Sequence, residues 1–159
     1  MKEQNLDFFG WISIEGTELN YPVMHTPKDE EYYLRRDFNG EDSQSGVPFL
    51  SASCYEGCVN YLIYGHNMKN GSMFATLLAY ADRDFLGQHP SIRFYQYTDL
   101  CDPDIFTEYM EQVQEAALYD TGINAKHGDS LLTLSTCSYH TENGRFVVVA
   151  RGMQPPYFR

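Results

Sequence analysis

The stretch LLTLSTC, residues Leu131–Cys137, decides the fold prediction. It is apolar, it favours β structure, and it ends abruptly at a cysteine. After a polar segment, RFVVVAR at Arg145–Arg151 forms a second β-favouring run. The pattern predicts one strand that carries a thiol at its C-terminal tip and a second strand that begins with an arginine. Nucleophiles at strand ends, with a cation one strand away, are a common way to build a site on a rigid sheet.

A histidine follows another strong strand signal. Tyr61–Tyr64 is a short buried-strand pattern, and His66 comes after it, separated by one glycine. A neighbouring imidazole or guanidinium favours the thiolate, which is the nucleophilic form of cysteine. His66 and Arg145 are therefore candidates for the base and the oxyanion donor of a nucleophile at Cys137. From spacing alone, each residue also has an ordinary explanation: a buried small residue, a hydrogen-bonded histidine and a solvated charge.

The rest of the chain contributes short strands and a few helices. Further strands are predicted at Phe9–Ile14, Leu19–Met24, Val47–Ala52 and Ile92–Phe94. Helical segments are predicted at Asp29–Arg36, at Met73–Ala81 with Ser72 as N-cap, at Asp82–Gln88, and from an N-cap at Asp102 to Leu118. This mixture predicts a mostly β fold, a closed or nearly closed barrel with two or three peripheral helices, rather than a parallel α/β sheet.

Length, charge and cysteine spacing narrow the class of protein. The chain has 159 residues, which suits a single domain with a real core. Its net charge of −11 argues against nucleic acid as a partner and against adsorption to an anionic membrane surface. The four cysteines lack zinc-site spacing. Cys54 and Cys58 are equally compatible with one local disulfide and with two unpaired thiols.

Three motifs resemble the sortases, the transpeptidases of Gram-positive bacteria. TLSTC at Thr133–Cys137 is similar to the family's cysteine motif, and YGHNM at Tyr64–Met68 is similar to its histidine motif. Arg145–Arg151 resembles the strand that bears the family's essential arginine. The opening FGWI at Phe9–Ile12 and the helix that ends at Leu118 are similar to class B sortases in particular. The resemblance covers nearly the whole chain in the same order.

This resemblance implies a single catalytic domain over residues 1–159, built on a closed barrel of about eight strands when complete. It implies a cysteine transpeptidase that cleaves a C-terminal sorting motif of secreted proteins after threonine. The product is held as a thioacyl-enzyme and passed to an amine of a peptidoglycan precursor or a pilin. Cys137 would be the nucleophile, His66 the general acid and base, and Arg145 the group that holds substrate and oxyanion. No cofactor or metal is implied.

The resemblance also implies a substrate-binding set and a location. Ser135 and Thr136 are at positions that line the site, Ser138 follows the nucleophile, and Leu34 is a candidate for the substrate groove. We expect a monomer at the extracellular face of a Gram-positive cell membrane, with the natural N-terminal anchor absent from this sequence.

Two features depart from the family pattern. A barrel hairpin is expected between Phe94 and Tyr97; either the chain is a shortened variant or a stretch is missing, and we expect the second because lost strands expose unpaired edges. His140 lies three residues after Cys137 and is an alternative base, although we favour His66. Two alternatives to a transpeptidase remain: a thiol peptidase or amidase that uses water, and a catalytically silent module that binds sorting peptides.

Overall fold

The computed structural model describes residues 1–55, 58, 60–95, 104–126, 128–139 and 144–152. The chain forms, in order, β1 (Phe8–Ser13), β2 (Asn20–Met24), the 3-10 helix η1 (Tyr32–Arg35), β3 (Phe49–Leu50), β4 (Asn60–Tyr64), the 3-10 helix η2 (Phe74–Ala81), α1 (Arg83–Gln88), β5 (Arg93–Tyr95), α2 (Asp104–Ala116), β6 (Leu131–Cys137) and β7 (Arg145–Arg151).

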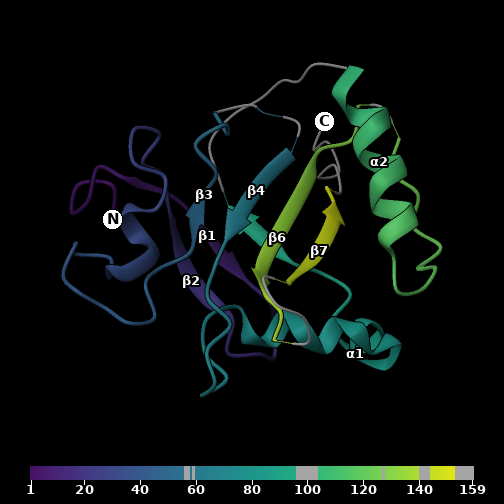
Figure 1. The fold of residues 1–159 in the computed structure, drawn as a ribbon, viewed down its shortest axis with the longest axis horizontal. Coiled ribbons are helices and arrows are strands. Elements are labelled where there is room, and N and C mark those ends of the chain that lie inside the picture. The colour runs from purple at the N-terminus through teal and green to yellow at the C-terminus, as the bar shows by residue number, and fades with distance from the viewer. Residues whose placement is uncertain (56–57, 59, 96–103, 127, 140–143, 153–159) are drawn as a thin grey trace, which may run out of the picture.

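The strands form one curled sheet. Across the described residues its seven strands follow the order β5-β1-β2-β3-β4-β6-β7, so β5 and β7 lie at the two edges of a half-barrel. β4 and β6 run parallel, whereas β6 and β7 run antiparallel. Figure 1 shows α1 across one end of the strands and α2 on the side of β7. The predicted mostly β fold with few helices is confirmed.

Alternation along the strands separates a core face from an open face. Ile12, Ile63 and Leu134 are fully buried and pack with Phe74 of η2 in the main hydrophobic cluster. The approach of η2 to the sheet requires a glycine at position 65, because a Cβ there would lie 2.6 Å from the ring of Phe74. Burial of this face holds β4 and β6 in the register on which the site depends.

Most predicted strands form, but several local predictions change. The segment expected as a strand at Val47–Ala52 is a strand only over Phe49–Leu50, and the helix expected at Asp29–Arg36 is one 3-10 turn. The prediction that Ser72 caps a helix is wrong. Met73 occupies the N-cap position at φ 56°, no side chain caps the helix, and the Phe74 N–H donates to the His66 carbonyl.

Some predictions fall outside the part of the chain that the structure describes. They are the hairpin between Phe94 and Tyr97, the cap at Asp102, and His140 as an alternative base. In the described ranges, every helix is too short or too polar to cross a bilayer.

Candidate active site

The site forms where β4 and β6 end side by side. The two strands are parallel, with Tyr64 opposite Ser135, so the chain leaves both at the same end of the sheet. The Gly65 N–H donates to the Ser135 carbonyl at 3.1 Å, which extends the pairing one residue beyond β4. The structure therefore brings His66 and Cys137, from distant parts of the sequence, to neighbouring strand tips.

Arg145 is brought directly to the thiol. Cys137 is the last residue of β6 and pairs across the sheet with Arg145, the first residue of β7. The guanidinium Nη1 of Arg145 lies 3.8 Å from Cys137 Sγ. Cys137 is half-buried and Arg145 is exposed, so the sulfur is accessible next to a permanent positive charge. A guanidinium at this distance presents N–H donors where charge develops during acyl transfer.

Side-chain hydrogen bonds join the tips of β4 and β6. The Thr136 hydroxyl donates to the Gly65 carbonyl at 2.8 Å, and the Asn67 side-chain amide donates to the Cys137 carbonyl at 3.0 Å. The Tyr139 hydroxyl donates to the Asn67 carbonyl at 2.8 Å. The positions of Asn67 and Tyr139 were not anticipated from sequence. The available signal was that each polar side chain closely follows a strand end beside a candidate catalytic residue.

His66 is held from the other side by the η1 turn. Its Nε2 lies 2.9 Å from the backbone carbonyl oxygen of Leu34. His66 is half-buried, and its backbone carbonyl accepts a hydrogen bond from the N–H of Phe74. Contacts from η1 and η2 thus orient the residue that follows β4.

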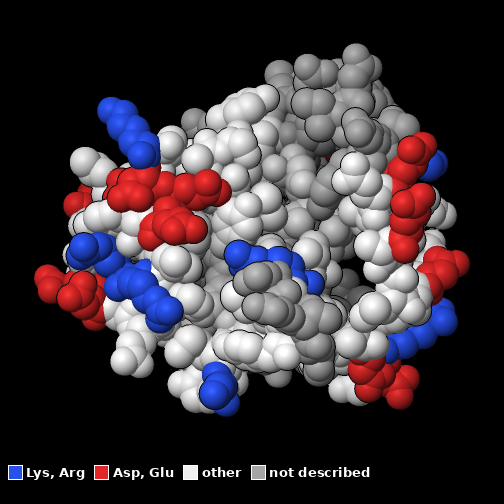
Figure 2. Space-filling view, in the orientation of Figure 1, with Lys and Arg blue, Asp and Glu red and all other residues white. Residues whose placement is uncertain are grey.

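A groove runs from this site along the open face of the sheet. Its volume is about 410 Å³, and its floor consists of alternating residues of β4, β6 and β7. The lining residues are Asn60, Leu62, Tyr64, Thr133, Ser135, Arg145 and Val147. From Asn60 to Tyr64 the floor extends about 13 Å, the length of a few extended peptide residues. In Figure 2 acidic side chains gather toward the two sides of the view, with basic ones among them, and a further basic group lies near the middle.

The predicted substrate-binding residues are placed differently from one another. Ser135 lines the groove. Thr136 points to the opposite face, is 0 % exposed, and has no surface with which to contact a peptide in this structure. The Ser138 N–H donates to the Gly144 carbonyl at 2.8 Å and extends the β6–β7 pairing. Leu34 is half-buried, and its backbone carbonyl is the part of the residue that contacts His66.

Comparison with known proteins agrees with this arrangement. The Sortase domain family profile matches residues 12–153. Sortase B of Listeria monocytogenes is 31% identical over 93% of this chain and 70% of its own length. The structure of Clostridium perfringens sortase B superposes with a TM-score of 0.85 at 28% identity, over 96% of this chain and 97% of that one. A Staphylococcus aureus sortase B–substrate complex gives a TM-score of 0.82 at 26% identity, over 94% and 81%.

The fold, the thiol beside a guanidinium and these matches define a cysteine transpeptidase. The chain belongs to the sortase family, and the relatives and solved structures that it matches are class B sortases. The predicted family and enzyme class are thereby confirmed.

Proposed function

We propose that this transpeptidase cleaves a C-terminal sorting motif of secreted proteins after threonine, through a thioacyl-enzyme on Cys137. The observation that carries the proposal is the position of Arg145, which lines the groove and whose Nη1 lies 3.8 Å from the Cys137 sulfur. A nucleophile, a fixed cation and a peptide-sized groove at one point are the requirements of acyl transfer from a peptide.

In the first half-reaction the Cys137 thiolate attacks the scissile carbonyl carbon and forms a C–S bond. Arg145 donates N–H groups to the oxyanion that develops on the carbonyl oxygen. Protonated His66 gives its proton to the leaving amine as the C–N bond breaks. In the second half-reaction an amine attacks the thioester, neutral His66 takes the amine proton, and sulfur leaves as thiolate.

The substrate peptide lies extended along the groove in this proposal. Ser135 contacts the peptide from the floor, because its side chain is on the groove face. Thr136 contributes from the core side through its bond to Gly65. Ser138 contributes by continuing the β6–β7 pairing, and Leu34 through its contact with His66.

The partners proposed are a sorting-motif peptide and an amine of a peptidoglycan precursor or a pilin. One similar structure is a sortase B–substrate complex, and the matching curated sortases come from Listeria monocytogenes and Staphylococcus aureus. We accordingly place the enzyme at the extracellular face of a Gram-positive cell membrane.

The test is a library of sorting-motif peptides incubated with the enzyme, with and without oligoglycine or a lysine-bearing pilin peptide. Mass spectrometry should show an amine-dependent ligated product that ends at threonine, and no product with Cys137→Ala. Hydrolysis that is unaffected by amine would replace the proposal with a thiol peptidase. Binding of peptide without any cleavage would replace it with a silent binding module.

A further inference from the structure

One nitrogen of the His66 ring already makes a hydrogen bond in the free enzyme. Nε2 lies 2.9 Å from the Leu34 carbonyl oxygen. A carbonyl oxygen can only accept a hydrogen bond, so Nε2 must carry the proton of this contact. In the neutral imidazole the remaining nitrogen, Nδ1, then holds the lone pair and is the only basic position of the ring.

We propose that the Leu34 carbonyl is a positioning group that fixes the Nε2–H tautomer of His66, so that Nδ1 performs every proton transfer. The proposal rests on the proposed role of His66 as general acid and base. The thiol proton of Cys137 moves to Nδ1, and the resulting imidazolium keeps its Nε2–H on Leu34. The Nδ1 proton then goes to the leaving amine, and Nδ1 accepts the proton of the incoming amine. Without the carbonyl, the neutral ring would divide between two tautomers, only one of them with a basic Nδ1.

The position of Leu34 is itself fixed by buried contacts of η1. Tyr33, next to it, is 1 % exposed. Its hydroxyl accepts from the Asn5 side-chain amide at 2.8 Å and donates to the Asp7 carboxylate at 3.0 Å. Desolvation by burial raises the pKa of Tyr33 to about 12, so the hydroxyl remains a donor at neutral pH. The Val47 N–H donates to the Tyr33 carbonyl at 3.1 Å.

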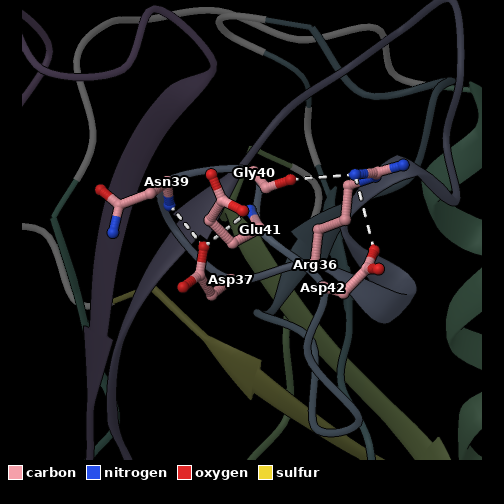
Figure 3. A network of polar contacts seen from close by, with 6 residues as sticks. All are labelled: Arg36, Asp37, Asn39, Gly40, Glu41 and Asp42. Atoms are coloured by element: carbon pink, nitrogen blue, oxygen red, sulfur yellow. Dashed lines mark hydrogen bonds and ion pairs between the residues drawn. The ribbon is translucent and has the colours of Figure 1, made fainter.

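The turn that follows η1 is closed by its own polar contacts (Figure 3). Arg36 Nη1 donates to the Gly40 carbonyl at 2.9 Å and lies 3.8 Å from the Asp42 carboxylate. The Asp37 carboxylate accepts from two backbone N–H groups of the same turn. The segment on the C-terminal side of Leu34 therefore holds its shape without contacts from the groove.

Gly46 offers a way to move the Leu34 carbonyl without touching His66. Its φ is 57°, and a Cβ at this position would lie 2.5 Å from the carbonyl oxygens of both Leu34 and Tyr33. Because both contacts are with backbone, Gly46→Ala must displace the turn. Gly122 provides a matched control: its φ is 71°, but a Cβ there meets no atom within 4 Å. Gly122→Ala thus introduces the same kind of backbone strain away from η1.

The decisive measurement is the tautomer of His66 in the wild-type protein, by two-bond 1H–15N correlation at a pH where the ring is neutral. His66→Gln identifies the resonances by their loss. We expect a protonated Nε2 and an unprotonated Nδ1. A proton on Nδ1 would overturn the proposal, whether or not any variant folds.

The variants then test whether the tautomer matters for transfer. Gly46→Ala should give a mixed tautomer signal and a lower kcat with little change in KM. Loss of the competent tautomer lowers kcat in proportion to its population, and misplacement of the ring adds up to about 10²-fold. Gly122→Ala should match wild type in both. Tyr33→Phe, which removes only the hydroxyl ties, should change signal and kcat in the same direction to a smaller extent. An unmixed Nε2–H signal together with reduced kcat in Gly46→Ala would contradict the link.

The proposed function can fail separately from this inference. Absence of amine-dependent transfer in wild type, with the Nε2–H tautomer present, would reject the transpeptidase reaction while leaving the Leu34 contact established. Transfer with the opposite tautomer would reject only the role of Leu34.

Discussion

Two regions of the described part of the chain hold free thiols, and they differ in what surrounds the sulfur. At the end of β6, Cys137 lies beside the Arg145 guanidinium at the end of a groove. Ahead of β4, Cys54 and Cys58 form a thiol pair that shares one acceptor, the carbonyl of Asn60. That oxygen lies 3.7 Å from Cys54 Sγ and 3.2 Å from Cys58 Sγ.

The thiol pair also contains an acidic cysteine. The hydrogen bond from Cys54 lowers the pKa of Cys58 to about 7. The pKa of Cys54 is raised well above its usual range. The largest cause is the same hydrogen bond, and the second is burial of the thiol. Neither residue lines the groove. Cys137 differs because its sulfur lies beside the Arg145 guanidinium, which lines the groove, and because β6 pairs with the strand that leads to His66.

The largest expected effect separates the two regions by activity. Cys137→Ala should reduce amine-dependent transfer about 10⁴-fold or more, as expected for loss of a covalent nucleophile. Cys58→Ser should retain the wild-type rate, because Cys58 donates to the backbone carbonyl of Asn60, at the end of β4 opposite to the tip beside Cys137. Initial rates with a sorting-motif peptide and an amine measure both. A loss in Cys58→Ser comparable with that in Cys137→Ala would remove the distinction between the regions.

The next effect tests the cation that distinguishes Cys137. Arg145→Lys keeps the charge but loses the planar set of donors, and kcat/KM should fall about 10²–10³-fold. The matched control is Arg151→Lys at the other end of β7, where Nη1 bonds the Asn124 carbonyl at 3.0 Å, away from the thiol. It should leave kcat/KM unchanged. Full activity of Arg145→Lys would exclude an oxyanion role for the guanidinium fork.

Local sequence pattern was sufficient for the strands that build the site. β6 and β7 follow the predicted limits because each is a continuous β-favouring run bounded by polar residues. Because Cys137 ends β6 and Arg145 begins β7, the predicted limits of these two strands were enough to place the two residues side by side. His66 required one more step, the parallel pairing of β4 with β6, which a single sequence does not specify.

The remaining parts of the site depend on contacts between distant segments. Asn67 bonds a carbonyl 70 positions away, and Leu34 acts on His66 from 32 positions away. Leu34 was predicted as a groove side chain, but its observed contact is through the backbone, which side-chain patterns do not reveal. The opposite orientations of Ser135 and Thr136 follow from strand alternation and could have been predicted.

A smaller effect concerns the hydrogen bond from Thr136 to Gly65, which joins the tips of β6 and β4. Thr136→Val keeps the side-chain shape but leaves the part-buried Gly65 carbonyl without its hydroxyl donor. The free energy of unfolding should fall by about 1–3 kcal/mol, measured by urea denaturation. Ser135→Ala, one residue earlier on the groove face, is the control and should act mainly on KM. Equal stability losses in the two variants would contradict the special role of Thr136.

The smallest effect is in the thiol pair itself and uses a background of Cys101→Ser and Cys137→Ala. A lowered pKa means that Cys58 becomes thiolate as pH rises through about 7 and is protonated below it. Its alkylation by iodoacetamide at pH 7 should be only about threefold faster than that of an ordinary thiol, because greater ionisation is partly offset by weaker nucleophilicity.

Removing its hydrogen-bond donor with Cys54→Ala should shift this alkylation profile to higher pH, as followed by mass spectrometry of the labelled peptide. An unchanged profile would show that Cys54 does not set the acidity of Cys58. The same labelling in protein that retains Cys137, with Cys137 protected reversibly and then released, should leave transfer intact. A thiolate can then form and react at Cys58 without effect on transfer, because among the three described thiols it is Cys137 that lies beside the Arg145 guanidinium.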